Sequence, residues 1–377
     1  MGFRVTNIAW YYILGSFLVA STLAPVSCMN LPPPDNNNGC DAKECIPLQK
    51  CPHLVQLLRT PTSESIRKVQ AATCFIERSI PMVCCHTTRA VKPPGNKLLP
   101  SKPGTCGQGT TNGLLRIFGG QEAPIDGYPW IAAMGYSELG FGYIQYHCAG
   151  SIINERYILT AAHCVSPAVL NLKKLEIITI GDWDLSTSQD CQRTSTGLEL
   201  CAPPALNYTY EQIIIHPKYD TRAPYSDDIA LIRLSSRIDL STKWVHPICL
   251  PPQGMNVQRL VGDREAVVAG WGTTEAGQGS SRLLHVLLPL ETIGFCNNTY
   301  GGKMVKGQVC FGGDVGQDSC AGDSGGPLVL GGPRDQPPFL QIGIVSYGPS
   351  TCGLDSVPGV YTSVSDYRDW IDENVRP

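Results

Sequence analysis

Short apolar runs rich in β-branched residues recur through the C-terminal two thirds of the 377-residue chain. They alternate with turn residues, and typical examples are KLEIITIG, DIALIRL, EAVVAGWG and LQIGIVSYG. Runs of this length between turn signals predict strands, and their spacing favours an all-β sandwich or barrel over residues 117–377. Only the segment from Ser365 to Val375 has helical spacing, with apolar side chains on one side at Tyr367, Trp370, Ile371 and Val375.

Residues 1–28 have the features of a secretory signal. Arg4 supplies a positive charge, the run from Ile8 to Ala20 is largely apolar, and small residues follow as far as Cys28. A membrane anchor is the alternative, but this run is short and no other span of about 20 apolar residues exists. The net charge of −3 comes with no long basic run, so we expect no nucleic-acid partner. We therefore expect a secreted, extracellular protein with no membrane partner.

Seventeen cysteines in a secreted chain indicate disulfides and not zinc ligands. If Cys28 leaves with the signal, six of the remaining sixteen lie in residues 40–85 and nine lie from Cys148 onward. A block of nine cannot pair internally without a remainder, and Cys106 stands alone between the blocks. Parity therefore predicts a covalent bond between Cys106 and the C-terminal domain.

The same blocks predict the domain organisation. Residues 40–85 are too few for a sufficient apolar core, so we expect three disulfides to hold this small domain together. Residues 86–116 are rich in Pro, Gly, Lys, Ser and Thr, which is typical of an exposed linker. Residues 117–377 form the large, mainly β domain.

Three motifs in the large domain carry candidate chemistry. Ser324 lies in DSCAGDSGGP, a composition that by itself usually marks a surface turn. A nucleophilic serine needs a base and a partner that orients the base. His163 ends the apolar run YILTAAHC beside Cys164, whose disulfide would fix the backbone next to the imidazole. Asp228 directly precedes a strand that looks buried, where a histidine N–H would offset the desolvation of its carboxylate.

The motifs LTAAHC, DIALIRL and GDSGGP, in this order, resemble those of the chymotrypsin-like serine proteases. The resemblance covers 117–377 and implies a chymotrypsin-like double β-barrel that needs no cofactor for catalysis. It implies Ser324 as nucleophile, His163 as base and Asp228, not Asp227, as the residue that holds the imidazole tautomer. The oxyanion hole would be formed by the amides of Gly322 and Ser324.

The resemblance is to trypsin in particular. It implies Asp318 at the floor of the specificity pocket, where an acid selects Arg or Lys before the cut bond. Ser346, Gly348 and Gly359 would form the pocket walls. Some clotting proteases of the family have Tyr at the position of Pro358 and respond to sodium, so we expect no sodium dependence here.

The sequence GLLR-IFGG resembles the activation junction of such proteases, with Phe118 in place of the commoner Val. Cleavage after Arg116 by an upstream trypsin-like protease would free the amino group of Ile117. In the family this ammonium turns inward and pairs with the acid beside the nucleophile, here Asp323. A plain linker arginine is the alternative interpretation.

The cysteine spacing of residues 40–85 resembles the clip domain of arthropod serine proteases, and an extra loop bridge resembles the easter-like members. The resemblance implies a complete set of disulfides: Cys40–Cys84, Cys45–Cys74, Cys51–Cys85, Cys106–Cys249, Cys148–Cys164, Cys191–Cys201, Cys296–Cys310 and Cys320–Cys352.

The loop before Cys191 has two interpretations. In relatives, acids and a Thr at fixed offsets hold calcium, and Asp182, Asp184, Thr187 and Asp190 stand at those places. Asp182 replaces a longer Glu, and a solvated acidic turn is the alternative. Separately, Asn207 and Asn297 begin glycosylation sequons that we expect in loops.

These expectations describe a secreted protease zymogen that cuts protein substrates in an extracellular, haemolymph-like cascade. Its partners would be an activating protease, a zymogen or pro-ligand substrate, and a serpin inhibitor. Two immune pathways stay open, prophenoloxidase activation and processing of the Toll-pathway ligand. The alternatives are a non-catalytic clip-domain adaptor, a developmental-patterning protease and a digestive enzyme, which would not explain the clip domain.

Overall fold

The computed structural model describes residues 45–58, 65, 69, 72–77, 80–85, 98–100, 104–110, 121–138, 142–194, 197–272, 279–313, 323–332, 338–349 and 357–377. The chain divides into two units, Met1–Pro93 and Pro94–Pro377. Within the described residues, no helix is both long enough and apolar enough to cross a membrane.

The small unit contains a three-stranded antiparallel sheet in the order β1-β3-β2. Its core is small and includes Leu54 and Val83, and Cys51 is fully buried in its disulfide with Cys85. So few buried apolar groups would stabilise a fold only weakly, which is why the disulfide matters here. The elements are β1 (Cys45–Pro47), η1 (Leu48–Lys50), α2 (Pro52–Leu57), β2 (Thr73–Glu77) and β3 (Ile80–Cys84).

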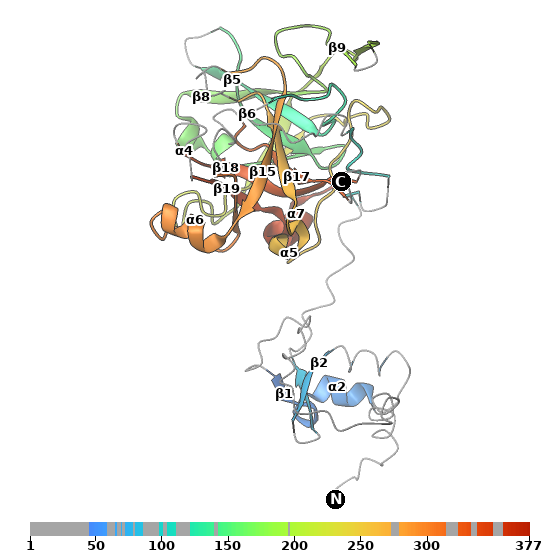
Figure 1. The fold of residues 1–377 in the computed structure, drawn as a ribbon, viewed down its shortest axis with the longest axis vertical. Helices are drawn as coiled ribbons and strands as arrows, with labels where there is room; N and C mark the ends of the chain where they lie inside the picture. The colour runs from blue at the N-terminus through green and yellow to red at the C-terminus, as the bar shows by residue number, and fades with distance from the viewer. Residues whose placement is uncertain are drawn as a thin grey trace, which may run out of the picture. The chain divides into compact units, whose positions relative to one another are not determined.

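The large unit is built from two seven-stranded sheets, shown in Figure 1 as mostly green and mostly orange-to-red strands, and a separate two-stranded sheet of β9 and β10. The strands are β4 (Gln121–Glu122), β5 (Ile131–Glu138), β6 (Gln145–Ile152), β7 (Tyr157–Thr160), β8 (Lys173–Ile180), β9 (Cys191–Arg193), β10 (Glu199–Cys201), β11 (Leu206–Tyr208), β12 (Tyr210–Ile215), β13 (Ala230–Leu234), β14 (Glu265–Gly270), β15 (Leu284–Glu291), β16 (Gln308–Phe311), β17 (Pro327–Leu330), β18 (Leu340–Tyr347) and β19 (Gly359–Ser363).

Strand pairing closes the second sheet into a barrel. Its order is β14-β17-β18-β19-β16-β15-β4, and β14 also pairs with β15, so six strands form a ring. The first sheet has the order β11-β8-β5-β6-β7-β13-β12, and the hydroxyl of Tyr210 on β12 donates to the carbonyl of Leu175 on β8. Closure of the six-stranded ring removes edges that would otherwise invite pairing with other chains. The predicted mainly β, double-barrel fold is confirmed.

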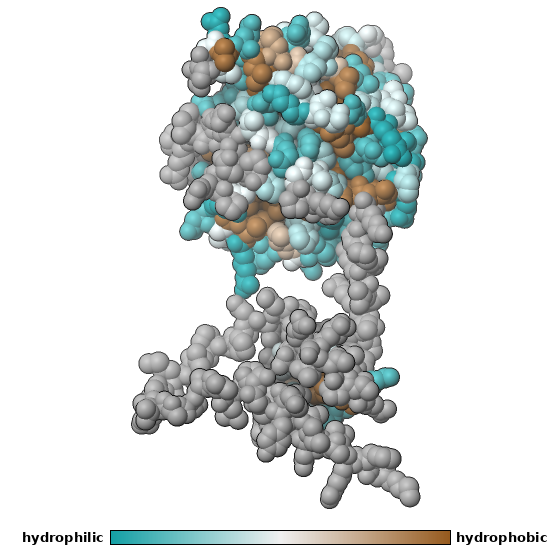
Figure 2. All heavy atoms as spheres, turned by 90° about the vertical axis from the view of Figure 1, so that its right-hand side faces the viewer, coloured by the Kyte–Doolittle hydropathy of each residue, from teal (hydrophilic) through white to brown (hydrophobic). Residues whose placement is uncertain are grey.

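Each barrel has its own apolar interior. Strand β7 is buried throughout, and β13 is buried except at Arg233. The second barrel is filled around Phe311 and Tyr361, which lie edge to face. On the face seen in Figure 2, exposed apolar side chains form small separate patches among polar ones.

The predicted C-terminal helix is present. A 3₁₀ turn, η4 (Val364–Tyr367), leads into α7 (Arg368–Asn374), and Ile371 and Val375 are buried. The other short helices are η2 (Ala162–Cys164), α4 (Pro167–Leu170), α5 (Val257–Val261) and α6 (Ile293–Thr299).

The prediction that 86–116 is an exposed linker is wrong for part of the segment. Residues 98–100 and 104–110 belong to the large unit, and Leu99 and Cys106 are each only 3% exposed. The composition predicted an exposed linker, but Pro, Gly and Thr also suit a backbone that lies closely against another surface.

Candidate active site

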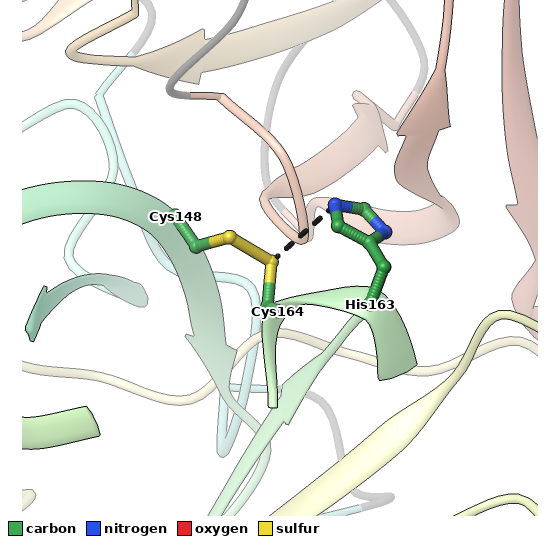
Figure 3. Close-up of side chains that lie close together, drawn as sticks. All are labelled: Cys148, His163 and Cys164. Atoms are coloured by element: carbon green, nitrogen blue, oxygen red, sulfur yellow. Dashed lines mark hydrogen bonds between the residues drawn. A yellow bond between two sulfur atoms is a disulfide. The ribbon is translucent and has the colours of Figure 1, made fainter. Parts of the chain in front are cut away.

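His163 lies on η2, directly after the buried strand β7. A disulfide joins its neighbour Cys164 to Cys148 on β6, and Figure 3 shows the imidazole beside this bond. Sγ of Cys164 lies 3.6 Å from Nε2 of His163. A disulfide sulfur carries no proton, so this contact gives Nε2 no hydrogen-bond donor. Both cysteines are bonded to each other, which makes the grouping with His163 a packing arrangement and not a metal site.

The carboxylate of Asp228 is fully buried and surrounded by donors. Oδ1 accepts the backbone N–H of His163 at 2.9 Å, and Oδ2 lies 2.7 Å from Nδ1 of the same residue. The hydroxyl of Ser346 donates to Oδ2 at 2.6 Å. These donors offset the cost of burying the carboxylate. Because a carboxylate can only accept, Nδ1 carries the proton and Nε2 is left as the basic nitrogen.

Ser324 lies just before β17, at a turn that only glycine allows. Gly325 has φ 77°, and a Cβ there would lie 2.2 Å from Oγ1 of Thr160. The carbonyl of Ser324 accepts the N–H of Ala149, and the N–H of Gly325 donates to Val345. These bonds attach the turn to β6 and β18, and hence to both barrels.

Ser324 and His163 line one cavity of about 640 Å³ between the barrels. The same cavity is lined by Trp271 and by two exposed apolar side chains, Val169 and Leu172, which are 49% and 54% exposed. The arrangement places Ser324 and the oriented imidazole of His163 in one open cleft. These groups are what acyl transfer through an activated serine requires.

The predicted pocket walls lie together at the end of the second barrel. Ser346 is on β18, Gly348 follows it, and Gly359 begins β19. A Cβ on Gly348 would lie 3.8 Å from Cα of Gly359, so the two glycines face each other across the space between the strands. Asp318 and Gly322 lie outside the described residues.

The carboxylate of Asp323 lies against two glycines of one segment, Gly270 and Gly272. Oδ1 accepts the N–H of Gly272 at 2.9 Å. A Cβ on Gly270 would lie 2.0 Å from Oδ1, and one on Gly272 would lie 2.6 Å from Oδ2. The glycines therefore make the room that this acid occupies. Arg116 and Ile117 lie outside the described residues.

Comparison with known proteins identifies the family. The family model for trypsin matches residues 117–371, and the model for the regulatory CLIP domain of proteinases matches residues 34–85. The chain belongs to the clip-domain serine proteases. It is therefore a trypsin-like serine endopeptidase, a class of enzyme that needs no catalytic cofactor.

Two relatives match most of this clip-domain protease. Phenoloxidase-activating factor 1 of Holotrichia diomphalia is 35% identical over 382 residues, covering 98% of both chains. Serine protease ea of Drosophila melanogaster is 37% identical over 351 residues, covering 88% of both. Among solved structures, the Grass clip serine protease of the Drosophila Toll pathway matches with 33% identity and a TM-score of 0.61, covering 87% of this chain and 93% of that one.

Five disulfides lie within the described residues of the protease. They are Cys51–Cys85, Cys106–Cys249, Cys148–Cys164, Cys191–Cys201 and Cys296–Cys310. The pairings expected for Cys40, Cys84, Cys74, Cys320 and Cys352 fall on residues or side chains outside that description. Cys45 is disulfide-bonded.

In the acidic loop, the four expected ligand residues lie close together around Asp190. Asp190 accepts the N–H groups of Trp183 and Asp184 through Oδ2, and Thr187 donates to its Oδ1. Oδ1 of Asp182 is buried without a hydrogen-bond partner. Burial, with the charges of Asp190 and Asp184, raises the pKa of Asp182 to about 7. The carboxylate of Asp184 is instead engaged by Ser186 and by Arg282.

Sequence reasoning missed two groups beside the proposed catalytic residues. Ser346 was expected only as a pocket wall, yet its hydroxyl binds Asp228. The ring of Tyr225 lies edge-on to His163, with centroids 5.7 Å apart, and at 5.3 Å from the ring of Tyr347. No local pattern marks either role, because the partners come from distant strands.

The expectation that both sequons lie in loops is wrong. Asn207 is exposed on β11, where its Oδ1 accepts from the hydroxyl of Thr179. Asn297 is half-buried in α6, and its Oδ1 accepts from the N–H of Met304. The turn-like residues around each asparagine are compatible with an edge strand and a short helix.

Proposed function

We propose that this clip-domain protease is a secreted zymogen, activated by cleavage after Arg116, that cuts protein substrates after Arg or Lys in an extracellular cascade. The observation that carries the proposal is the contact of His163 with the buried Asp228 in the cleft that also presents Ser324. A non-catalytic adaptor would not need a buried carboxylate satisfied in this way. The relatives whose names refer to phenoloxidase activation and melanization support a place in such a cascade.

The chemistry follows from the positions of these groups. Nε2 of His163 would take the Ser324 proton as Oγ attacks the scissile carbonyl, and would later give it to the leaving amine. Asp228 would stabilise the imidazolium formed in between. The amides of Gly322 and Ser324 would bind the developing oxyanion, a contribution of about 2.7–4 kcal/mol per donor.

Specificity is assigned to Asp318, which would meet the cationic side chain between the walls at Gly348 and Gly359. Activation is assigned to the Ile117 ammonium and Asp323, whose carboxylate already lies in the space left by Gly270 and Gly272. We expect a trypsin-like activating protease upstream, a zymogen or pro-ligand as substrate and a serpin as inhibitor. A relative named Spaetzle-processing enzyme keeps the Toll-ligand alternative open.

The test uses purified full-length protein, uncut and cut after Arg116. The cut form should hydrolyse an Arg-containing amide substrate, and the uncut form and an Arg116→Gln variant should not. The natural substrate is then the plasma protein that is newly cleaved when cut enzyme is added. Absence of amidase activity in correctly cut protein would contradict the proposal.

We also propose that the loop 182–190 binds a structural calcium ion through Asp182 and Asp190. The support is the buried, unpartnered oxygen of Asp182 and the raised pKa of its carboxyl group, both of which a cation would relieve. Calcium should raise the melting temperature of the wild type, and Asp182→Asn should abolish that rise. Asp184→Asn is the control, because Asp184 is bound to Arg282. Equal calcium responses in all three proteins would contradict the site.

A further inference from the structure

The segment between the clip domain and the activation junction is attached to the catalytic unit along most of its described length. We call residues 98–100 and 104–110 the clasp. At its start, Leu99 is 3% exposed and joins the apolar core that contains Trp130 and Ile153. The carbonyl of Leu98 accepts from Nδ2 of Asn154 at 3.2 Å. The clasp therefore begins with a side chain inserted into the catalytic domain.

The middle of the clasp pairs with the catalytic domain through its backbone. The N–H of Gly107 donates to the carbonyl of Pro247 at 2.8 Å, and its carbonyl accepts from the N–H of Phe339 at 2.9 Å. A Cβ on Gly107 would lie 2.3 Å from the carbonyl oxygen of Phe339. The slot between Pro247 and Phe339 thus accepts only glycine at position 107. The neighbouring residue, Cys106, forms its disulfide with Cys249.

The end of the clasp is bound at Asp126. The N–H of Thr110 donates to its carbonyl at 3.4 Å, and the hydroxyl donates to Oδ1 at 2.6 Å. A Cβ on Gly109 would lie 2.3 Å from the carbonyl oxygen of Gly127 and 3.0 Å from the ring of Trp130. Three separate surfaces, at Asn154, Phe339 and Asp126, therefore bind the clasp, and only one of its contacts is covalent.

We propose that the clasp is a non-covalent docking segment, which keeps the clip-bearing chain on the catalytic domain after activation even without the Cys106–Cys249 bond. The proposal rests on the proposed cleavage after Arg116, which turns the clasp into a contact between two chains. The disulfide then secures a complex that the clasp already forms.

The clasp lies away from the catalytic groups. Phe339 directly precedes β18, and Ser346 lies seven residues further along this strand, a separation of about 23 Å in extended chain. Changes in the clasp should therefore spare hydrolysis of small peptide substrates.

The experiment uses the full chain with Cys106→Ser and Cys249→Ser, cut after Arg116. Denaturing gels without reductant should show two chains, which establishes cleavage. Native size-exclusion chromatography should show them eluting together. Adding Leu99→Asp should release the clip chain, with at least a tenfold higher dissociation constant than the matched control Leu98→Asp, whose side chain is 37% exposed. Separation of the chains without any clasp substitution would overturn the proposal, as would retention in the Leu99→Asp protein.

A second measurement covers the case in which the disulfide-free protein does not fold. In the disulfide-intact protein, cut or uncut, the amides of Gly107 and Phe339 should be protected from hydrogen exchange. Leu99→Asp should accelerate exchange at both at least tenfold, and Leu98→Asp should not. Equal exchange in the two variants overturns the clasp. Failure of cleavage after Arg116 would contradict the proposed activation and leave this result intact.

Discussion

Nδ1 of His163 lies 2.7 Å from Oδ2 of Asp228, whose side chain is completely shielded from solvent. The neighbouring acid, Asp227, has a different set of partners: Arg222 at 2.7 Å and the hydroxyl of Tyr367 at 3.1 Å. Two adjacent carboxylates thus serve separate networks, and only one of them contacts the imidazole within hydrogen-bond distance.

This difference predicts unequal effects of the same substitution. Asp228→Asn would offer an N–H to Nδ1 and favour the wrong imidazole tautomer, which costs about 10⁴-fold in kcat in chymotrypsin-like proteases. Asp227→Asn should lower kcat far less, because its contacts with Arg222 and Tyr367 do not involve His163. Rates on an Arg amide substrate at neutral pH provide the measurement. Equal losses in the two variants would show that the orienting residue is misassigned.

Ser324→Ala removes the only proposed nucleophile. We expect loss of nearly all amidase activity, on the order of 10⁶-fold in kcat, with unchanged folding and unchanged cleavage after Arg116. Activity is measured on the cut protein, and circular dichroism and the gel pattern serve as controls. Substantial residual turnover would rule out Ser324 as nucleophile.

Gly325→Ala should destabilise the fold as well as the site. The left-handed backbone costs an Ala about 1–2 kcal/mol, and the added Cβ would also meet Thr160 and Ala149. Gly294→Ala is the control, because nothing lies within 4 Å of its Cβ position and its φ is not positive. Denaturant unfolding should show a loss of more than about 1 kcal/mol for the first variant. A tolerated Gly325→Ala would contradict the packing of the turn.

Asp318→Ser tests the specificity pocket. With the carboxylate gone, a cation in the pocket would be unpaired, so kcat/KM for Arg and Lys substrates should fall. The fall should correspond to a loss of about 3–5 kcal/mol of transition-state stabilisation if the pair is fully buried. Cleavage of a peptide library reports the preference of both proteins. A wild type that cuts after Phe or Leu would refute the pocket assignment.

A buried histidine predicts how stability depends on pH. Nδ1 of His285 lies 2.6 Å from the hydroxyl of Tyr128, and burial lowers the pKa of His285 to about 4. An unfolded histidine takes up its proton near pH 6.5, so the unfolded state is favoured as the pH falls from about 6.5 to 4. This residue alone should cost about 2–3 kcal/mol of stability at pH 4.5.

The measurement compares wild type with His285→Gln, whose amide can still accept from Tyr128 but does not titrate. Carboxylates titrate in both proteins, so the difference between their unfolding free energies isolates the histidine. The difference should change by about 2–3 kcal/mol in favour of the variant between pH 7.5 and pH 4.5. A constant difference would show that His285 is not buried as a neutral ring.

The sequence alone determined the features that local chemistry specifies. Strand periodicity predicted the mainly β fold, and cysteine parity predicted a bond from Cys106 to the large domain, which forms with Cys249. The motifs around His163, Asp228 and Ser324 suggested their proposed roles within a few residues each, because glycine turns and an adjacent disulfide shape the backbone locally.

Only the tertiary structure decided the contacts made by residues far apart in the chain. Ser346 binds Asp228 across 118 positions, and Asp184 binds Arg282 across 98 positions. The clasp looked like a linker because nothing in its composition reveals the slot at Pro247 and Phe339 or the core that receives Leu99. Burial and hydrogen bonding depend on which surface a segment meets, and that surface exists only once the barrels have closed.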